Sequence, residues 1–329
     1  MRVFVSGATG FLGKHTVKRL SEIGYDVIAF GRNEQAASFF KSMDNVVFVK
    51  GDLEDQALLA KLMKDVDLVI HSAALAAPYG QYELFYQTNV DGTQNIVNAS
   101  LSSNIKKFIY LSTPSVYFTN ESRKNVREND ELPQSHTNYY ARTKHIADLI
   151  VKEAVLKGLP AISLRPRQVF GPYDHTIFGR LIDTNKKRGI PLVNNGKILM
   201  DFTYVDNVVD VIMLSLMADD QFIGEFYNIT NDQPIYLIDA LTMLYSYLNE
   251  ELKTKKISPK LLSFISSSSE MIANITGKPP ILSKHVASFL SYDYTLNIDK
   301  IKKDLQYTPK ISLDEGMNRY TKWYLQENQ

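Results

Sequence analysis

The chain has 329 residues, which exceeds one average domain and predicts about two. Its hydrophobic fraction of 44% is ordinary for a globular protein with a substantial core. Lys and Arg together number 37 against 36 Asp and Glu, so the overall charge favours neither nucleic acid nor an anionic membrane as a partner.

The absence of cysteine excludes disulfides, thiolate catalysis and cysteine metal sites, and we expect no metal site. The sequence begins directly with a β-rich run and shows no basic-then-apolar leader. No apolar run reaches the ~18 residues needed to span a bilayer. We therefore expect a cytoplasmic protein without a transmembrane segment.

A glycine-rich segment joins the first predicted strand (residues 2–6) to the first predicted helix (residues 11–23). Gly7, Gly10 and Gly13 there follow a Gly-x-x-Gly-x-x-Gly pattern. In a dinucleotide-binding loop the first glycine permits a tight turn, the second admits the pyrophosphate, and the third lets the helix pack on the strand. The free N–H groups at the helix N-terminus then face the phosphates. The alternative is an ordinary strand-to-helix turn with incidental glycines.

The first half of the chain alternates between short apolar runs typical of buried strands and amphipathic runs typical of helices. This alternation favours a parallel sheet covered by helices on both faces, with ligands at the carboxyl ends of the strands. The further predicted strands are residues 26–30, 46–50, 68–71, 107–111 and 161–165, and the further predicted helices are residues 57–63, 82–103 and 139–157.

Turn signals interrupt this regularity after Pro166. Residues 205–216 are predicted to form a helix and residues 225–229 a strand that rejoins the sheet, whereas residues 237–329 are predicted to be mostly helical. The predicted fold is therefore α/β, a Rossmann-type doubly wound parallel sheet with a smaller, discontinuous C-terminal substrate domain. We expect residues 1–166, rejoined by roughly 201–230, to form the nucleotide-binding domain, and residues 167–200 and 231–329 to form the substrate domain.

Tyr140 and Lys144 are four residues apart, so on a helix they share one face. A tyrosine that exchanges a proton near neutral pH needs help, because its ordinary pKa is about 10. An ammonium one turn away would stabilise the phenolate and lower that pKa. Thr113, after an apolar run, offers a hydroxyl to a substrate oxygen. Tyr139 is the neighbouring candidate, but the residue four positions after it is Thr143, which cannot serve.

Together these segments resemble the extended short-chain dehydrogenases/reductases, the NAD-dependent epimerase/dehydratase superfamily, from Met1 almost to the C-terminus. The matching segments are residues 7–13, 51–53, 71–74, 89–93, 113–117, 140–144, 164–166 and 201–206. The resemblance implies that Thr113, Tyr140 and Lys144 are catalytic and that Asn89 supports the structure or a proton relay. The expected dinucleotide contacts are Gly7, Thr9, Gly10, Phe11, Leu12, Gly13, Arg32, Asp52, Leu53, Ala73, Ala74, Tyr140, Lys144, Pro166 and Val169.

Within that family, the sequence most resembles the 3β-hydroxysteroid dehydrogenase-like branch, which includes 2-alkyl-3-oxoalkanoate reductases. The resembling stretches are residues 77–80, 112–116, 164–167, 278–280 and 307–316. This branch implies reversible hydride transfer between a nicotinamide and a hydrophobic 3-oxo or 3-hydroxy substrate. The expected substrate contacts are Pro78, Pro114, Ser115, Arg167 and His175, and the apolar residues 261–265 and 271–272 either line the pocket or form the core face of a helix.

Two other functions remain open. Nucleotide-sugar dehydratases carry an Asp-Glu pair where this chain has Pro114-Ser115, but a 4-epimerase or nucleotide-sugar reductase needs only the Thr, Tyr and Lys. Epimerases usually also have a late arginine for the diphosphate; residues 289–294 contain none, although Arg167 could substitute. The second alternative is a non-catalytic regulator that senses NAD(P). Arg167, His175 and Arg180 could together meet an anionic group such as the carboxylate of a 3-oxo acid.

The second strand ends without an acid and is followed by Arg32, which could pair with a 2′-phosphate, so we expect NADP(H) to be slightly favoured over NAD(H). The expected partner is a small carbonyl or alcohol substrate, not nucleic acid. We also expect a homodimer, because Ile146, Leu149, Ile150 and Ala154 widen the apolar surface of the helix at 139–157.

Overall fold

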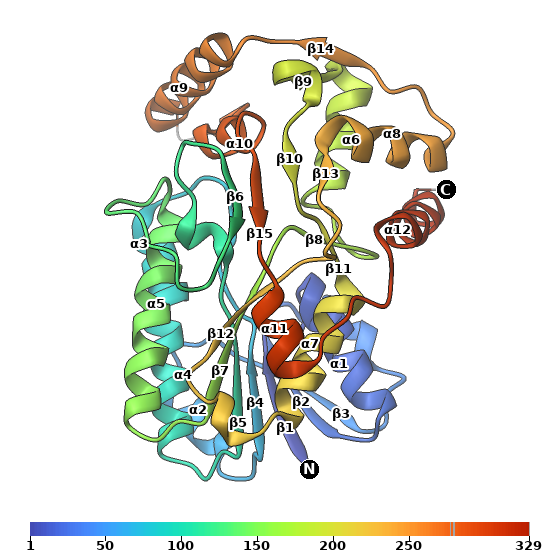
Figure 1. The fold of residues 1–329 in the computed structure, drawn as a ribbon. Helices are drawn as coiled ribbons and strands as arrows, with labels where there is room; N and C mark the ends of the chain where they lie inside the picture. Colours follow the sequence, from blue (N-terminus) through green and yellow to red (C-terminus); the bar gives the residue numbers. More distant parts are fainter. Residues whose placement is uncertain (277, 279, 329) are drawn as a thin grey trace.

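The computed structural model describes residues 1–276, 278 and 280–328 (Figure 1). Pro279, part of the resembling stretch at 278–280, lies outside the described residues. Gly277 and Gln329, which fall in the expected substrate domain, lie outside them too.

A seven-stranded parallel sheet forms the base of the molecule, in the order β12-β7-β5-β4-β1-β2-β3. Its strands are β1 (Arg2–Ser6), β2 (Asp26–Gly31), β3 (Val46–Lys50), β4 (Leu68–His71), β5 (Lys107–Leu111), β7 (Ala161–Pro166) and β12 (Phe226–Ile229). Strand order reverses between β1 and β4, and the crevice at such a reversal is where a doubly wound sheet binds its ligand. The predicted fold class is confirmed.

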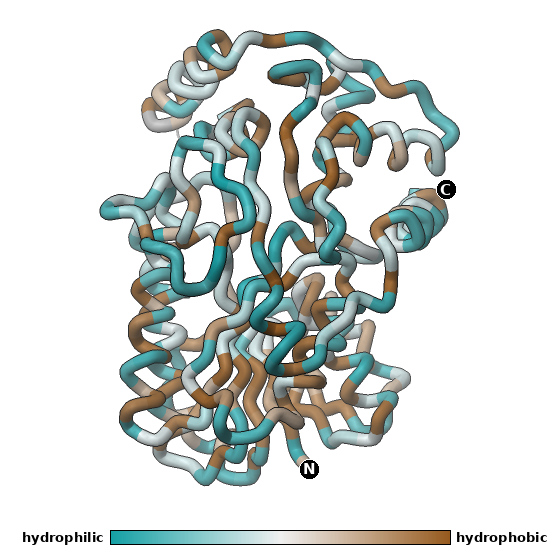
Figure 2. Tube along the Cα trace, in the orientation of Figure 1, coloured by the Kyte–Doolittle hydropathy of each residue, from teal (hydrophilic) through white to brown (hydrophobic). Residues whose placement is uncertain are grey.

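Helices cover both faces of the sheet because its strands are apolar on both sides (Figures 1 and 2). Val3 and Val5 belong to the core beneath α1 (Phe11–Glu22) and α7 (Val205–Met217), with α11 (Asp299–Leu305) on the same side. Phe4, between them in sequence, belongs to the opposite core. That core is covered by α2 (Gln56–Met63), α4 (Gly92–Leu101) and α5 (Tyr139–Leu156).

The predicted helix at residues 82–103 has an irregular middle. It comprises α3 (Tyr82–Tyr86), a π-helical turn at Gln87–Asp91 and then α4. The π turn contains the buried Asn89, whose side chain bonds to the backbone N–H and carbonyl of Leu75 at 2.7 and 3.2 Å. The same side chain donates to the hydroxyl of Thr143 in α5 at 3.0 Å. Asn89 therefore ties the loop after β4 to the helix that carries Tyr140 and Lys144.

The C-terminal part lies above the carboxyl edge of the sheet (Figure 1). Its core packs α6 (Phe178–Arg188), α8 (Leu237–Leu248) and α12 (Leu313–Glu327) together, with α9 (Pro259–Thr276) and α10 (Lys284–Phe289) above the first half of the chain. Its short strands form a sheet ordered β13-β10-β15-β6 and the pairs β11-β8 and β14-β9. These strands are β6 (Arg123–Val126), β8 (Val169–Phe170), β9 (Ile190–Leu192), β10 (Leu199–Met200), β11 (Thr203–Tyr204), β13 (Ile235–Tyr236), β14 (Thr254–Lys256) and β15 (Tyr294–Leu296).

No helix within residues 1–276, 278 and 280–328 is both long enough and apolar enough to cross a bilayer.

Candidate active site

The glycine loop sits where β1 turns into α1, at the reversal of strand order. Gly7 has φ +68°, and a Cβ there would lie 2.8 Å from the backbone of Ala73. A Cβ on Gly13 would lie 2.2 Å from the carbonyl oxygen of Gly7, so only glycine lets α1 start this close to β1. Gly10 is the N-cap of α1 and no side chain among the described residues caps the helix, which leaves its first N–H groups open to an anion.

A cavity of about 200 Å³ opens beside this loop. Its lining combines the glycine loop with the ends of β2, β3 and β4, as expected for the adenosine side of a dinucleotide. The lining residues are Gly7, Thr9, Gly10, Phe30, Gly31, Arg32, Asn33, Gly51, Asp52, Leu53, Ser72, Ala73, Ala74 and Thr88. Arg32 pairs loosely with Asp52 at 3.6 Å and is 70% exposed, so its guanidinium is available to a ligand. These residues fit a nicotinamide dinucleotide.

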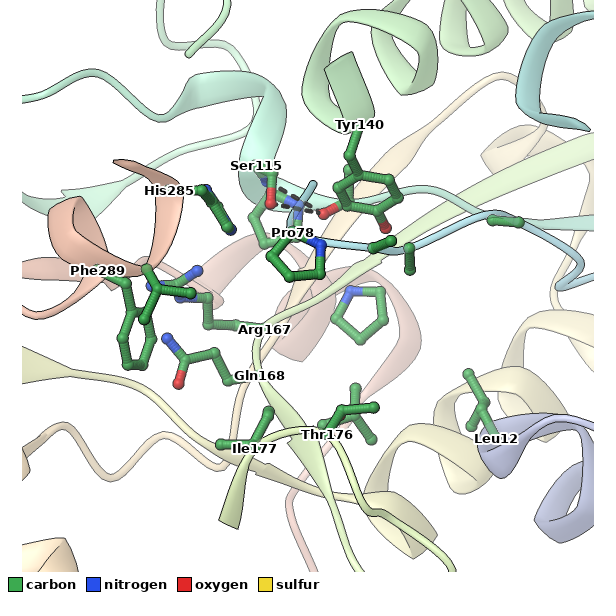
Figure 3. A pocket seen from close by; sticks show the side chains of 18 of the residues that line it. Leu12, Pro78, Ser115, Tyr140, Arg167, Gln168, Thr176, Ile177, His285 and Phe289 are labelled. Carbon is green, nitrogen blue, oxygen red and sulfur yellow. Dashed lines mark hydrogen bonds between the residues drawn. The ribbon is translucent and has the colours of Figure 1, made fainter. Parts of the chain in front are cut away.

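A larger cavity of about 450 Å³ lies between the carboxyl ends of β5 and β7, α6 and α10 (Figure 3). Apolar side chains line most of it, including Pro78 from the loop after β4, Ile177 and Leu181 at α6, and Val286 and Phe289 of α10. Such a cavity, apolar with a few convergent polar groups, is typical of a small-molecule site.

Tyr140 and Thr113 meet at one side of this cavity, where their hydroxyl groups hydrogen-bond. Thr113 also donates to the hydroxyl of Ser115 at 3.1 Å and accepts from its backbone N–H at 3.2 Å. Tyr139, in contrast, is 48% exposed and packs on Tyr82 with ring centroids 5.3 Å apart. The geometry therefore brings Tyr140, not its neighbour, to the cavity.

Lys144 lies beneath Tyr140 as a buried cation. Its Nζ donates to the carbonyl of Leu111 at 2.7 Å and sits 4.2 Å from the ring centroid of Tyr110. Burial lowers the pKa of Lys144 to about 7, against the opposing attraction of Asp148. The sequence predicted a lowered pKa for Tyr140, whereas in the structure burial raises it, and the hydrogen bond with Thr113 offsets this shift only in part. Tyr140 is accordingly neutral and holds its proton.

A buried ion pair anchors the helix that carries both residues. Asp148, one turn after Lys144, accepts from Arg165 of β7 at 2.6 Å and from Ser112 at the end of β5 at 2.5 Å. Removing one member of such a pair leaves a buried charge without its counterion. The pair thus fixes α5 against the two strands whose ends line the cavity.

Arg167 lies on the side of the cavity opposite Tyr140 (Figure 3). Its guanidinium is buried over the ring of Tyr294, 4.4 Å from the centroid, and makes no ion pair with any described residue. Within the described chain, its Nε and both amide atoms of Gln168 are buried without a hydrogen-bond partner. Burial lowers the pKa of Arg167 to about 10, which leaves it charged at neutral pH. Buried polar groups of this kind call for a partner, and here a ligand can supply it.

His285 of α10 borders the same region and links it to α5. Its Nδ1 lies 2.8 Å from Nδ2 of Asn138, and the Oδ1 of Asn138 caps α5 by accepting from Ala141 N–H at 2.7 Å. Burial, and then the charge of Arg167, lower the pKa of His285 to about 4, so this ring is neutral.

The structure gathers most of the predicted site residues into the two cavities. The larger one is lined by Leu12, Ala74, Pro78, Thr113, Pro114, Ser115, Tyr140, Pro166, Arg167 and Val169, together with Arg180. Gly13, Phe11 and Lys144 support the cavities from outside their lining. His175 does not join Arg167: it is exposed, and its ring packs on Trp323 at 5.2 Å.

Sequence reasoning missed Gln168, His285 and Phe289 in the larger cavity and Asn33 and Thr88 in the smaller. Gln168 directly follows Arg167, so its position after a strand was a usable signal. His285 lies 147 residues after Asn138, the cap of α5, and no motif connects His285 or Phe289 to that helix.

Comparisons with known proteins agree with this geometry. The family model for the NAD dependent epimerase/dehydratase family matches residues 3–230. The chain is 30% identical to a 2-alkyl-3-oxoalkanoate reductase from Stenotrophomonas maltophilia, over 97% of this chain and 98% of the relative. It is 31% identical to the mouse sterol-4-alpha-carboxylate 3-dehydrogenase (decarboxylating), over 96% and 88% of the two chains.

Among solved structures, the UDP-glucuronic acid 4-epimerase from Bacillus cereus in complex with NAD superposes with a TM-score of 0.81, at 23% identity and full coverage of both chains. That likeness shows the fold. The glycine loop, the strand order and the family match lead to one conclusion: the chain belongs to the NAD dependent epimerase/dehydratase family, the extended short-chain dehydrogenases/reductases, and is an enzyme that works with a nicotinamide dinucleotide.

Proposed function

We propose that this enzyme interconverts hydrophobic 3-oxo acids and 3-hydroxy acids. One observation carries the proposal. The apolar cavity has a proton-bearing Tyr140–Thr113 pair on one side and, on the other, the cation of Arg167, which pairs with no acid among the described residues. The alkyl part would contact the apolar walls, and the carboxylate would pair with Arg167. The names of the 2-alkyl-3-oxoalkanoate reductase and the sterol-carboxylate dehydrogenase support the same substrate class.

Tyr140 is the proposed acid in reduction and base in oxidation. The residues of the glycine loop and the smaller cavity would hold the dinucleotide, which when bound would supply a hydride to the carbonyl carbon in one direction and receive it from the carbinol carbon in the other. In reduction, the Tyr140 hydroxyl donates its proton to the substrate oxygen, which Thr113 holds by a hydrogen bond. The raised pKa of Tyr140 suits this donor role, and the charge of Lys144 would stabilise the phenolate that remains.

Tyr140→Phe tests these roles, with Tyr139→Phe as the matched control one residue away. We expect the first variant to lower kcat by at least about 100-fold, since a positioned acid typically contributes 10²–10⁴-fold. Dinucleotide affinity, measured by fluorescence titration, should change little in either variant. A Tyr140→Phe enzyme with near-native turnover would refute the assignment.

Arg167→Met tests the carboxylate contact, with Arg180→Met as a second arginine at the same cavity. For a 2-alkyl-3-oxo acid we expect KM to rise at least about tenfold in the Arg167 variant, because a charge-assisted pair is lost. For the methyl ester of the same acid, KM should stay close to the native value. An equal loss for acid and ester would instead indicate a packing role, and stabilisation by a UDP-sugar that Arg167→Met abolishes would favour the epimerase.

NADP(H) is the proposed preference over NAD(H). Arg32 and Asn33 follow β2 directly and line the smaller cavity, and neither is an acid that would accept ribose hydroxyls and repel a 2′-phosphate. Arg32→Gln should weaken NADPH binding about tenfold more than NADH binding, whereas Lys50→Gln, at an exposed ion pair nearby, should affect neither. Tighter native binding of NADH would overturn the preference.

We also propose a homodimer paired through α5 and a cytoplasmic location. The exposed Leu149 and Leu156 of α5 support the first, and the demand of the reaction for the cellular nicotinamide pool supports the second.

A further inference from the structure

Helix α9 presents to solvent an apolar face that the proposed catalysis does not use. Its residues recur at intervals of three and four, so they share one side of the helix. They are Leu261, Phe264, Ile265, Met271, Ile272 and Ile275, and all are exposed. Ile281, five residues after the helix ends, is exposed too. Phe264 is 69% exposed and Ile275 80% exposed. Singly exposed apolar residues are common on proteins, but a contiguous stripe of this kind marks an interaction site.

The fold already uses the other side of α9. Leu262, Ser266 and Ala273 are buried there, where α9 packs on α10. The exposed stripe is therefore not the core face of the helix, and in Figure 1 α9 lies at the outer edge of the molecule. In Figure 2 brown and pale bands alternate along this helix.

The segment that contains the stripe carries a strong excess of positive charge. Residues 252–284 contain six lysines and one glutamate, a net charge of +5 in a chain whose overall net charge is +1. The one acid, Glu270, is occupied: it pairs with Lys284 at 3.9 Å and accepts the N–H of that residue at 2.7 Å. Lys253, Lys255, Lys256, Lys260 and Lys278 are exposed and pair with no acid among the described residues.

An apolar helix face in a segment rich in exposed lysines matches the surface of an anionic bilayer. The apolar side chains can enter the headgroup boundary while the lysines attract the acidic lipids. A second protein copy fits less well, because two such faces would bring their lysines together. We infer that α9 is a peripheral membrane anchor, which lays its apolar face on the surface of an anionic bilayer without crossing it.

The position of α9 relates membrane contact to the larger cavity. It packs on α10, and α10 supplies His285, Val286, Phe289 and Leu290 to the wall of the larger cavity. A bilayer under α9 would therefore lie next to the wall of the site, where an apolar substrate could pass from lipid to enzyme. The inferred membrane contact does not depend on the identity of the substrate, because none of the stripe residues lines the cavity.

Co-sedimentation with vesicles tests the anchor. Wild type should pellet with phosphatidylcholine vesicles that contain phosphatidylglycerol, should pellet at least fivefold less with pure phosphatidylcholine, and should dissociate at high salt. Phe264→Ser/Ile272→Ser/Ile275→Ser should lower the bound fraction at least tenfold. Lys255→Glu/Lys256→Glu should also lower the bound fraction at least tenfold when measured at low salt. The control Ile23→Ser/Val47→Ser/Met217→Ser, also at exposed apolar positions, should bind as wild type does.

A fluorescence probe locates the contact. The chain has one tryptophan, Trp323, so Phe264→Trp adds a single new reporter, and Met217→Trp is its control. Emission of the first should shift to the blue on anionic vesicles and that of the second should not. Unchanged solution turnover in the triple variant would show that it is folded. The inference would be overturned if wild type did not bind vesicles or if the α9 triple variant bound them fully. A halved solution mass in that variant would also overturn it, because the face would then belong to an interface with a second copy.

Discussion

Lys144 is the residue of the site whose charged form is most disfavoured by burial. An ammonium buried under Tyr140 is stabilised by one carbonyl and an aromatic ring, and burial lowers its pKa from 10.5 to about 7. The folded protein therefore binds this proton less tightly than the unfolded chain does. Below pH 7 the buried charge destabilises the folded state by its full amount, and between pH 7 and 10.5 this destabilisation decreases progressively.

Lys144→Met should accordingly abolish turnover yet stabilise the fold at neutral pH. The difference in pKa sets an upper bound of about 5 kcal/mol on the gain, and loss of the Leu111 hydrogen bond reduces it. Denaturant unfolding of both proteins at pH 7 and pH 10 measures this difference, which should shrink at the higher pH. A variant less stable than wild type at pH 7 would contradict the assignment of a costly buried charge.

At this scale the sequence predicted the residues that lie close together along the chain. Tyr140 and Lys144 share a helix face, and Thr113 follows a strand, so their spacing alone identifies them as candidate catalytic residues. His285 and Gln168 were out of reach, because their place in the cavity depends on how α10 and the segment after β7 pack above the sheet. The separation of His175 from Arg167 has the same cause: the turn after Phe170 directs His175 to Trp323.

Helix α5 depends on its first turn to aim Tyr140. Asn138 caps the helix and also bonds to His285, so one side chain joins the catalytic helix to the wall of the cavity. Ser312 caps α12 in the same way, by accepting from Glu315 N–H at 3.2 Å, and α12 adds no residue to the cavity lining.

Asn138→Ala should cost about 1 kcal/mol of stability, as cap removal typically does, and should also lower kcat several-fold. Ser312→Ala should cost a similar free energy with native kcat, and Asn138→Asp, which retains the capping oxygen, should restore stability. Thermal unfolding and steady-state rates on one substrate separate the two effects. Equal kinetic behaviour of the two alanine variants would leave Asn138 a purely structural residue.

Elements with strong local patterns were predicted well, and short ones were not. The strands of the parallel sheet and the helices between them follow the expected ranges, because continuous apolar runs need burial on both faces. The predicted mostly helical stretch 237–329 contains β14 and β15, three residues each, whose partners β9 and β6 come from far earlier in the chain. Such strands form because of their partners, and their own sequence carries little signal.

The whole molecule is expected to pair through the outer face of α5. Leu156 is 84% exposed and Leu149 is also exposed, whereas Ala154 belongs to the core of its own chain and Ile150 packs against that core. The apolar surface open to a partner is therefore narrower than the sequence suggested.

Light scattering should give twice the chain mass of 37.4 kDa at micromolar concentration. Leu149→Glu/Leu156→Glu should shift the mass towards a single chain, because buried unpaired charges are costly, while Met217→Glu on α7 should not. A native mass of one chain throughout the concentration range would exclude this pairing.

The pairing of β6 with β15 has a consequence for synthesis of the protein on the ribosome. β6 is complete at Val126, but its partner begins at Tyr294, and the small core of Val116, Phe118 and Val126 is closed by the same late segment. At ordinary translation rates the ribosome needs roughly 10–30 s to add the intervening residues. Throughout that interval the nascent chain exposes an unpaired edge and an open aromatic cluster beside the future cavity. This enzyme should therefore need chaperone protection after its nucleotide-binding residues have been synthesised and before α10 has been synthesised. A chain arrested before Tyr294 should be cut by protease within residues 116–126.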